Sequence, residues 1–212
     1  MHPMEVIGVG FLLLATATSV PTANTPSTCE PIMIETFDTY KGNPPALPLL
    51  PNPVPKPAQG LVYSGWNVLE FAKTANIIPE SGNHTIGAFV TNNIAKGAGV
   101  SLKATGSISA GTAMKPFDLT SFYFACILPD GTTVIARALP CKIRVSSLGV
   151  SDEIFTIEKT NLVGQNNMQK ATLSPNFMGV EKVTIILETV AGVLPGDGGV
   201  FFVDNVEHRD NC

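Results

Sequence analysis

The chain has 212 residues, 44% hydrophobic side chains, 14% charged side chains and a formal net charge of -4, with 19 Gly and 17 Pro. It is long enough for one well-buried domain or at most two small ones, too apolar for a disordered chain and too rich in Gly and Pro for a helical bundle. The acidic balance leaves no basic patch for nucleic acid or for anionic lipid, so we expect neither partner.

An apolar stretch opens the chain at residues 6–17. It is shorter than the roughly 20 residues that span a bilayer and has the size of a signal-peptide core. Ala15 and Ala17 match the small-x-small cleavage pattern, so we predict a signal peptide at residues 1–17, with Ala23 as a later cleavage position. The residues before the stretch lack Lys and Arg, which leaves a buried first helix as the alternative.

The C-terminal residues, VEHRDNC, are polar and do not match an anchor-attachment tail. The sequence therefore predicts a secreted protein, extracellular or in the cell wall, without a membrane anchor. We expect an N-terminal extension at residues 18–31 and a single domain at residues 32–212.

A proline-rich segment at residues 43–57 interrupts this domain after a first strand at residues 32–38. Proline removes a backbone donor and restricts φ, so we expect a rigid, polyproline-like loop that is neither sheet nor helix. Domains that recognise such segments are intracellular partners, which does not favour a docking role in an exported chain.

From residue 60 onward, short apolar runs alternate with turn clusters at the spacing of a sandwich or barrel. Alternation places Phe122 with Phe124 on one face and points Lys142 and Arg144 outward. No window sustains a helical apolar stripe. The sequence predicts an all-β antiparallel sandwich of about ten strands after the proline-rich loop, at residues 60–71, 84–92, 99–105, 117–128, 132–138, 141–147, 153–160, 170–173, 180–189 and 200–207.

Four cysteines in an exported chain predict two disulfides, for which three connectivities exist. Cys126 and Cys141 flank a Pro-Asp-Gly turn, so they can face each other on neighbouring strands. Cys29 and Cys212 lie just outside the first and last strands. We therefore predict bridges 126–141 and 29–212. A metal site is the rival interpretation, but it lacks a CxxC pair or a histidine at ligand spacing.

Asn83-His84-Thr85 is the usable N-glycosylation sequon. In a secreted eukaryotic protein it indicates an exposed loop with a glycan on Asn83.

The segments TFDT, GLVYSGWNVL, FDLTSFYFACIL, CKIRV, FMGVEKVTI and FFVDNVE occur in this order within residues 35–207. In this order they resemble secreted fungal and bacterial jelly-roll β-sandwich proteins that are similar to carbohydrate-binding modules. The resemblance implies a jelly-roll fold and specifies a fold better than an activity. The chain lacks the sorting tail of the bacterial proteins and inserts the proline-rich segment, which favours a fungal-type secreted protein.

The resemblance also implies a structural calcium between the first and last strands. The matching oxygen-bearing residues are Glu35, Asp38, Asp204 and Asn205, with Glu207 as a further ligand. Hard cations take six to eight oxygens, and carboxylates from both ends of the domain plus backbone carbonyls can supply them. The alternative is that these residues end strands in solvent.

A sugar site needs a flat aromatic face bordered by polar groups. We predict Tyr63 or Trp66 for the aromatic face, and for the polar groups Asn67 and the loop Gln165-Asn166-Asn167, whose amides can bond hydroxyls. A lone Trp in a sandwich also fits the core, and the Gln-Asn-Asn loop also fits an exposed turn.

A catalytic site is not identified. His2 lies in the presequence, His84 in the sequon and His208 in the expected tail, so no Ser/His/Asp set can be assembled. Asp152 and Glu153 are adjacent on a strand and should point to opposite faces, whereas glycoside hydrolysis needs two carboxylates facing one cleft.

The leading hypothesis is a secreted, calcium-stabilised β-sandwich that binds a cell-wall or extracellular polysaccharide without altering it. The alternatives are an effector-like or structural protein that binds a protein partner, and a polysaccharide-active hydrolase or lyase.

Overall fold

The structure is a computed structural model. It describes residues 31–42, 52–70, 76–89, 103–111, 116–127, 137–161, 164–191 and 199–210. These residues form thirteen strands and one short 3-10 helix: β1 (Met33–Glu35), β2 (Leu61–Ser64), β3 (Trp66–Glu70), β4 (Ile77–Ile78), β5 (His84–Ala88), β6 (Thr105–Ala110), β7 (Phe117–Ile127), β8 (Cys141–Ser147), β9 (Val150–Ile157), β10 (Asn166–Asn167), β11 (Gln169–Thr172), η1 (Pro175–Phe177), β12 (Lys182–Val190) and β13 (Val200–Asp210).

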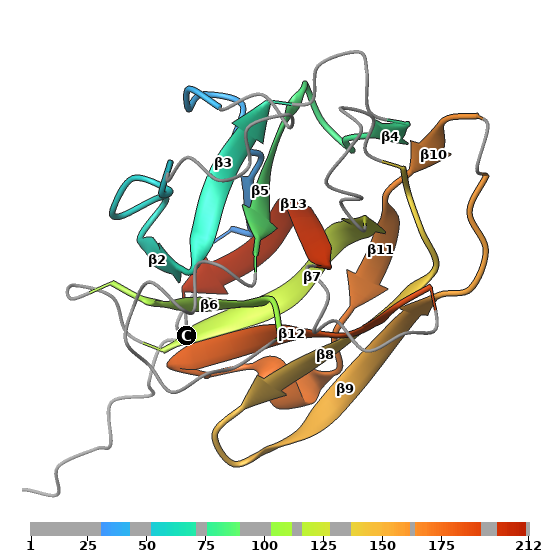
Figure 1. The fold of residues 1–212 in the computed structure, drawn as a ribbon. Coiled ribbons are helices and arrows are strands. Elements are labelled where there is room, and N and C mark those ends of the chain that lie inside the picture. The colour runs from blue at the N-terminus through green and yellow to red at the C-terminus, as the bar shows by residue number, and fades with distance from the viewer. Residues whose placement is uncertain are drawn as a thin grey trace, which may run out of the picture.

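Two antiparallel sheets pack face to face as a sandwich, which confirms the predicted all-β class (Figure 1). The six-stranded sheet has the order β11-β7-β13-β5-β3, with β1 also pairing with β13. The five-stranded sheet has the order β2-β6-β12-β8-β9. A short parallel pair, β4 with β10, lies outside both sheets.

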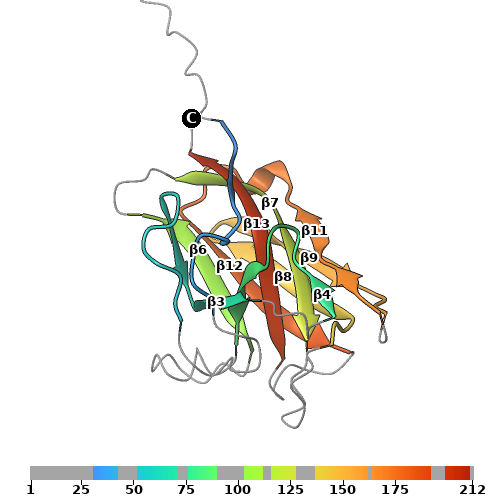
Figure 2. The ribbon, with the colours of Figure 1, turned by 90° about the horizontal axis from the view of Figure 1, so that it is seen from above.

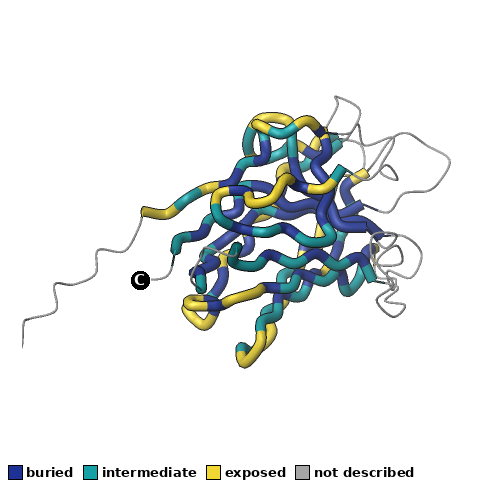
Figure 3. Tube along the Cα trace, turned by 90° about the vertical axis from the view of Figure 1, so that its left-hand side faces the viewer, coloured by how far each residue is buried: buried dark blue, intermediate teal, exposed yellow. Residues whose placement is uncertain are grey.

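The core lies between the two sheets and follows the alternation seen in the sequence. The inward residues of β12, Val183, Ile185 and Leu187, are fully buried. Phe122 and Phe124 of β7 oppose them from the six-stranded sheet and belong to the same apolar cluster. Figure 3 shows the buried residues in the middle of the molecule and the exposed ones at the loops.

Gly65 carries the chain from one sheet to the other. The predicted single strand at residues 60–71 is two strands, because β2 pairs with β6 in the five-stranded sheet and β3 pairs with β5 in the six-stranded sheet. Gly65 lies between them with a φ of 87°, a conformation that glycine adopts without steric cost. Tyr63 and Trp66 therefore reach the same core from opposite sheets.

β13 is the central strand of the six-stranded sheet and has two partners along one edge. β5 pairs with its residues 201–203 and β1 with its residues 206–208, while β7 pairs along its other edge. The register with β7 shifts after Asp204, and Asn205 has a φ of 45°. This bulge lies where the first partner strand ends and the second begins, so it separates the two halves of the strand.

A second, smaller apolar cluster covers the outer side of the six-stranded sheet. Leu69, Ala125 and Phe202 form its base, and Ile77 of β4 with Met168 beside β10 packs over them. Tyr123 is half-buried against this cluster. This side of the sheet is therefore partly closed by protein.

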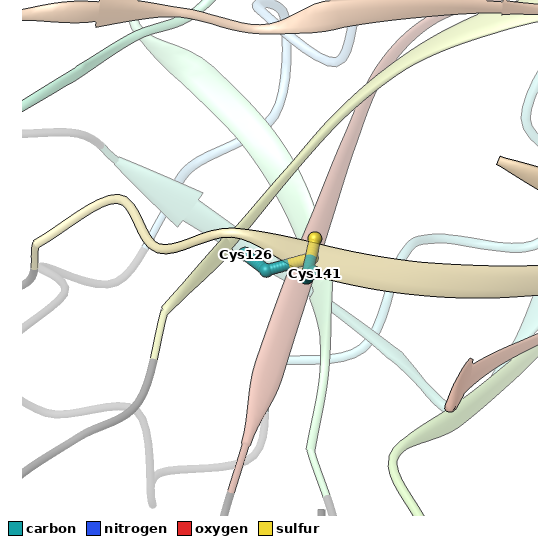
Figure 4. The surroundings of a disulfide bond; sticks show 2 residues. All are labelled: Cys126 and Cys141. Carbon is teal, nitrogen blue, oxygen red and sulfur yellow. A yellow bond between two sulfur atoms is a disulfide. The ribbon is translucent and has the colours of Figure 1, made fainter. Parts of the chain in front are cut away.

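The disulfide between Cys126 and Cys141 is present, as predicted (Figure 4). Cys126 belongs to β7 and Cys141 to β8, so the bridge joins the two sheets across the core. The expectation that the two cysteines lie on neighbouring strands is wrong, because β7 and β8 belong to different sheets.

Several predictions lie on residues that the structure does not describe. These are the signal peptide at residues 1–17 with its alternative cleavage at Ala23, most of the extension at residues 18–31, the bridge Cys29–Cys212 and the first part of the proline-rich loop. In the described part of that loop, Val54 is buried in the core and Pro53 bridges to Asn67. No helix among the described residues is long and apolar enough to cross a membrane.

Candidate functional site

Three of the four predicted metal-ligating residues meet at the outer side of the six-stranded sheet. Asp38 follows β1, Asp204 and Asn205 form the β13 bulge, and Ser81 in the turn before β5 lies among them. We call these four residues the acidic cluster. It joins segments from both ends of the domain.

Hydrogen bonds hold the acidic cluster together. Ser81 donates its backbone N–H to Asp204 Oδ2 (3.0 Å), and its hydroxyl lies 2.7 Å from Asn205 Oδ1 and 3.2 Å from Asp38 Oδ2. Asp38 Oδ1 accepts the backbone N–H groups of Asn83 and His84 at 3.1 and 3.2 Å. The turn is therefore fastened to the carboxylates of two distant segments.

Asp204 is a fully buried carboxyl. Burial and, to a lesser extent, the nearby Asp38 charge raise its pKa to about 7, against the lowering effect of the backbone N–H groups of Ser81 and Asn205. A cation would stabilise the ionised form of this carboxyl, since the described residues supply only neutral donors to it.

Glu35, the fourth predicted ligand, lies elsewhere. It is on the inner side of β1, where its carboxylate accepts the Phe37 N–H (3.1 Å) and the Tyr40 hydroxyl (3.3 Å). Burial raises the pKa of Glu35. Glu207, the further candidate, forms an ion pair with Lys170 at 2.7 Å. Among the described residues, neither Glu35 nor Glu207 forms a hydrogen bond or an ion pair with the acidic cluster, so the predicted set is brought together only in part.

The acidic cluster has the donor chemistry of a calcium site but not a complete ligand set. Two carboxylates, an amide oxygen and a hydroxyl are hard oxygen donors. The described residues contain no group of three or more His, Cys, Asp and Glu side chains placed to hold a metal. Asp38, Asp204, Asn205 and Ser81 would hold a cation only together with further oxygens.

The predicted aromatic platform is not at the surface. Tyr63 and Trp66 are each 1% exposed and belong to the main core. Trp66 packs against Phe201 and donates its Nε1–H to the Ser107 carbonyl (3.1 Å). A ring enclosed on both sides has no face for a sugar, so the stacking role predicted for these two residues is wrong, and the core alternative holds.

The predicted polar groups divide into structural and accessible ones. Asn67 is buried, and its Oδ1 accepts the backbone N–H of Asn52 at 2.9 Å. Asn166 closes its own loop by donating Nδ2 to the Asn76 and Asn161 carbonyls. Gln165 and Asn167, on either side of it, are exposed. Only these two of the predicted ligand-binding residues are free to meet a ligand from solvent.

The outer side of the five-stranded sheet is a polar surface that the sequence analysis did not identify as a site. Cross-strand pairing places its outward residues in register. We call this surface the polar face, which comprises Thr105, Ser107 and Ser109 of β6, Lys182, Thr184, Ile186 and Glu188 of β12, Lys142, Arg144 and Ser146 of β8, and Asp152, Ile154 and Thr156 of β9.

Ion pairs cross the middle of the polar face. Arg144 donates Nε to Glu188 (2.7 Å) and Nη1 to Asp152 (3.0 Å), and Lys103, two residues before β6, also pairs with Glu188. Burial alone would raise the pKa of Glu188, but the hydrogen bonds and charges of Lys103 and Arg144 outweigh it and lower that pKa. The guanidinium is thus held in one place by two carboxylates.

The alternation in the sequence predicted that Lys142 and Arg144 point outward, and this is confirmed. Their partners could not be predicted, because Glu188 lies 44 residues further along and meets Arg144 only through the β8–β12 register. No aromatic side chain of the described strands lies on the polar face, since Tyr63 and Phe155 both pack inward.

The other candidate acids and bases do not form a catalytic pair. Asp152 points to Arg144 on the polar face, whereas Glu153 accepts the Ser174 N–H (3.1 Å) on the other side of β9, as strand geometry predicts. His208 is not in a tail but in β13, fully buried. Its two ring nitrogens have no hydrogen-bond partner in the described part of the chain.

No protein-family model matches the chain, and no curated protein matches it in sequence. Among solved structures, the chain matches that of TmCBM61 in complex with beta-1,4-galactotriose, with 12% sequence identity and a TM-score of 0.36. The match covers 76% of this chain and 100% of that one. At this level of identity and superposition, the similarity carries no argument about ligand or activity.

Proposed function

We propose that the protein is an exported, non-catalytic carbohydrate-binding β-sandwich and that its polar face contacts a polysaccharide. The main support for this proposal is Arg144, which two carboxylates hold in place on a sheet face that is otherwise rich in Ser and Thr hydroxyls. Hydroxyls donate and accept, and a guanidinium donates in a planar fork, so the face complements the hydroxyl rim of a saccharide.

The rigidity of the polar face supports this role. Arg144, Glu188 and Asp152 hold one another in place, and β8 pairs with β12 in continuous register from Ser147 to Ile143. Groups that are already ordered lose less conformational entropy when a ligand binds. An extended sugar chain lying across the strands would meet a preformed row of donors and acceptors.

Retention on insoluble polysaccharides, with analysis of the soluble fraction for released sugars, tests the proposal. Wild type should be retained without sugar release, and Arg144→Ala should reduce retention at least tenfold. Lys170→Ala is the matched control, because Lys170 is also an ion-paired cation but lies on the other sheet, beside Tyr123. Equal retention of wild type and Arg144→Ala, or release of oligosaccharides, contradicts the proposal.

We also propose that the acidic cluster holds a structural calcium ion. The support is the convergence of Asp38, Asp204 and Asn205, together with the buried carboxyl of Asp204 that only neutral groups solvate. When bound, the ion would tie the segment after β1 to the turn before β5 and to β13. This arrangement assigns the ion a structural role, apart from the polar face.

Thermal melting with and without a chelator tests the calcium proposal. Calcium should raise the melting temperature of wild type and of Asp152→Asn, a surface control from the polar face. It should not affect Asp38→Asn, which removes one carboxylate of the cluster. A melting temperature that does not respond to calcium in wild type refutes the ion site and leaves the polysaccharide proposal standing.

Export and glycosylation belong to the same proposal. Asn83 is exposed in the turn before β5, and its side-chain amide makes only a long contact of 3.5 Å with Glu70. A glycan attached there would extend into solvent. Export is also in keeping with the buried bridge between Cys126 and Cys141, since such bridges persist in oxidising compartments.

One observation favours a protein partner as the second candidate. Leu148, at the tip of the β8–β9 hairpin, is fully exposed, and Ile154 of β9 is 55% exposed. Contiguous exposed apolar surface marks sites where proteins dock, and these two side chains would contribute to such a surface on the β8–β9 hairpin. If the protein binds no polysaccharide but captures a purified extracellular protein in a way that Leu148→Ser abolishes, this second candidate replaces the first.

A further inference from the structure

The polar face carries more positive than negative charge, although the whole chain has a net charge of -4. Its cationic groups are Lys142, Arg144 and Lys182, and its anionic groups are Asp152 and Glu188. Lys103, which precedes β6, adds a further positive charge beside Glu188. In a protein that is acidic as a whole, this concentration of cations on one sheet face indicates the charge of what it binds.

Both acids of the polar face are already neutralised by cations. Glu188 accepts from Lys103 and Arg144, and Asp152 accepts from Arg144. Lys142 and Lys182 are exposed and form no ion pair with the described residues. The net charge presented to a ligand is therefore carried by these two lysines and by the donors left on Arg144.

Arg144 retains free donors in a fixed position. Its Nε and Nη1 each bond a carboxylate, while Nη2 has no hydrogen-bond partner among the described residues, and 35% of the side chain is exposed. A guanidinium held in this way offers its remaining N–H groups to an anionic oxygen with little loss of side-chain entropy.

The three cationic positions are spread along the strands. Lys142 lies two residues from Arg144 on β8, which corresponds to roughly 7 Å. Lys182 lies four residues along β12 from Ile186, the cross-strand partner of Arg144, or about 14 Å in the opposite direction. Thr184, between Lys182 and Ile186 on β12, is the cross-strand partner of Ser107 on β6, so hydroxyl groups lie between the cationic positions. This spacing suits an extended polymer that carries anionic groups at intervals, not a small ion.

We propose that the ligand of the polar face is an acidic polysaccharide whose sugar residues carry carboxylate groups. Lys142, Arg144 and Lys182 would meet the carboxylates, and the Ser and Thr rows would meet the hydroxyls. The inference rests on the proposed carbohydrate-binding function and specifies the chemical class of its ligand.

Binding to polygalacturonate and to its methyl-esterified form, without added calcium, tests the inference, because esterification removes the charge and keeps the sugar backbone. Wild type should bind the free acid at least tenfold more tightly than the ester. Its affinity for the acid should fall steeply between 50 and 500 mM NaCl, because salt screens exposed charges.

A pair of double variants locates the site. Lys142→Gln with Lys182→Gln should weaken binding to the free acid at least tenfold. Lys41→Gln with Lys170→Gln changes the net charge equally at exposed positions away from the polar face and should bind as wild type does. Thermal melting of all three proteins checks that each is folded.

The outcomes distinguish this inference from the proposed function. Equal binding to the acid and the ester, or binding of a neutral polysaccharide alone, overturns the ligand class and leaves the carbohydrate-binding function standing. Loss of binding in the control pair instead of the polar-face pair also overturns the inference. No retention on any polysaccharide, charged or neutral, overturns both.

Discussion

Asp204 and His208 are buried ionisable residues of β13, and burial shifts their pKa values in opposite directions. Burial raises the pKa of Asp204 from 3.8 to about 7. Burial lowers the pKa of His208 from 6.5 to about 4, opposed by the Asp210 charge. Each group is therefore uncharged in the folded protein at mildly acidic pH.

The two groups should contribute opposite pH dependences to the free energy of unfolding. Between about pH 4 and 6.5, folded Asp204 holds a proton that it loses on unfolding, so its contribution grows as the pH falls. Unfolded His208 gains a proton that the folded residue lacks, so its contribution falls over the same range. In the wild type the two slopes largely offset each other.

Single variants should separate these slopes. In Asp204→Asn only the contribution of His208 remains. The free energy of unfolding should then fall as the pH drops from 6.5 to 4, by roughly 1.4 kcal/mol per pH unit at most. In His208→Leu only the contribution of Asp204 remains, so the free energy of unfolding should rise as the pH drops from 7 to 4. Urea unfolding in chelator at several pH values measures both, and parallel profiles for the two variants would contradict the assignment.

Thr85 has a buried hydroxyl without a hydrogen-bond partner among the described residues. Its side chain is fully buried, and Oγ1 has no hydrogen-bond partner among the described residues. Valine has nearly the same shape without the polar group. Among the described residues, no contact in the folded protein requires the hydroxyl of Thr85. The hydroxyl is, however, required by the sequon that begins at Asn83.

Thr85→Val should therefore separate folding from glycosylation. In unglycosylated protein it should leave stability unchanged or raise it by about 1–3 kcal/mol, because an unsatisfied buried polar group is removed. In a eukaryotic secretion host it should abolish the mass shift from a glycan on Asn83, whereas Thr85→Ser should keep it. A wild-type mass without any glycan would show that the sequon is unused.

At the scale of the strands, the predictions from alternation succeeded where a strand has one buried face. β8 has the predicted bounds, residues 141–147, because its alternation is strict. Phe122 and Phe124 of β7 share the buried face, as the alternation predicted. Alternation does not indicate which strands pair, so neither the Gly65 crossing nor the contact between Arg144 and Glu188 could be predicted.

The candidate sites show the same limit. The acidic cluster was predicted in part, since Asp38, Asp204 and Asn205 meet, but Ser81 was missed because it lies in a turn without a motif. Glu35 was assigned to the wrong group because the pairing of β1 with β13 sets it opposite Val206, which faces the core. The residues of the polar face come from four strands and are brought together only by the cross-strand register, which the sequence does not indicate.

Gly106 of β6 lies directly against the indole ring of Trp66, which comes from the other sheet. A Cβ at Gly106 would overlap the indole ring, including Nε1 at 2.6 Å. Gly106→Ala should destabilise the protein by about 1–3 kcal/mol, because the ring is fixed between the sheets. Ser107→Ala, one residue along on the polar face, should change stability by less than about 0.5 kcal/mol. Urea midpoints of the two variants provide the comparison, and equal midpoints would contradict this packing.

At the scale of the whole molecule, one covalent link joins the two sheets in the described residues. The bridge between Cys126 and Cys141 closes a segment with a sequence separation of 15. The chain-entropy estimate for a loop of this length is about 3 kcal/mol. Replacing both cysteines with Ala should lower the free energy of unfolding by about that amount, measured against wild type kept oxidised. A loss below about 1 kcal/mol would mean that packing alone holds the sheets together.

The pairing of β1 with the last part of β13 brings the two ends of the described chain to one side of the sandwich. Met33 lies opposite His208, and Figure 2 shows the first strand beside the C-terminal end. A surface or fusion partner joined directly before residue 31 or after residue 210 therefore pulls on neighbouring strands of the same sheet and holds the molecule in much the same orientation. Sensor-chip measurements with N-terminal and C-terminal tethers should then expose the same far end of the domain to the analyte, which makes the two formats interchangeable.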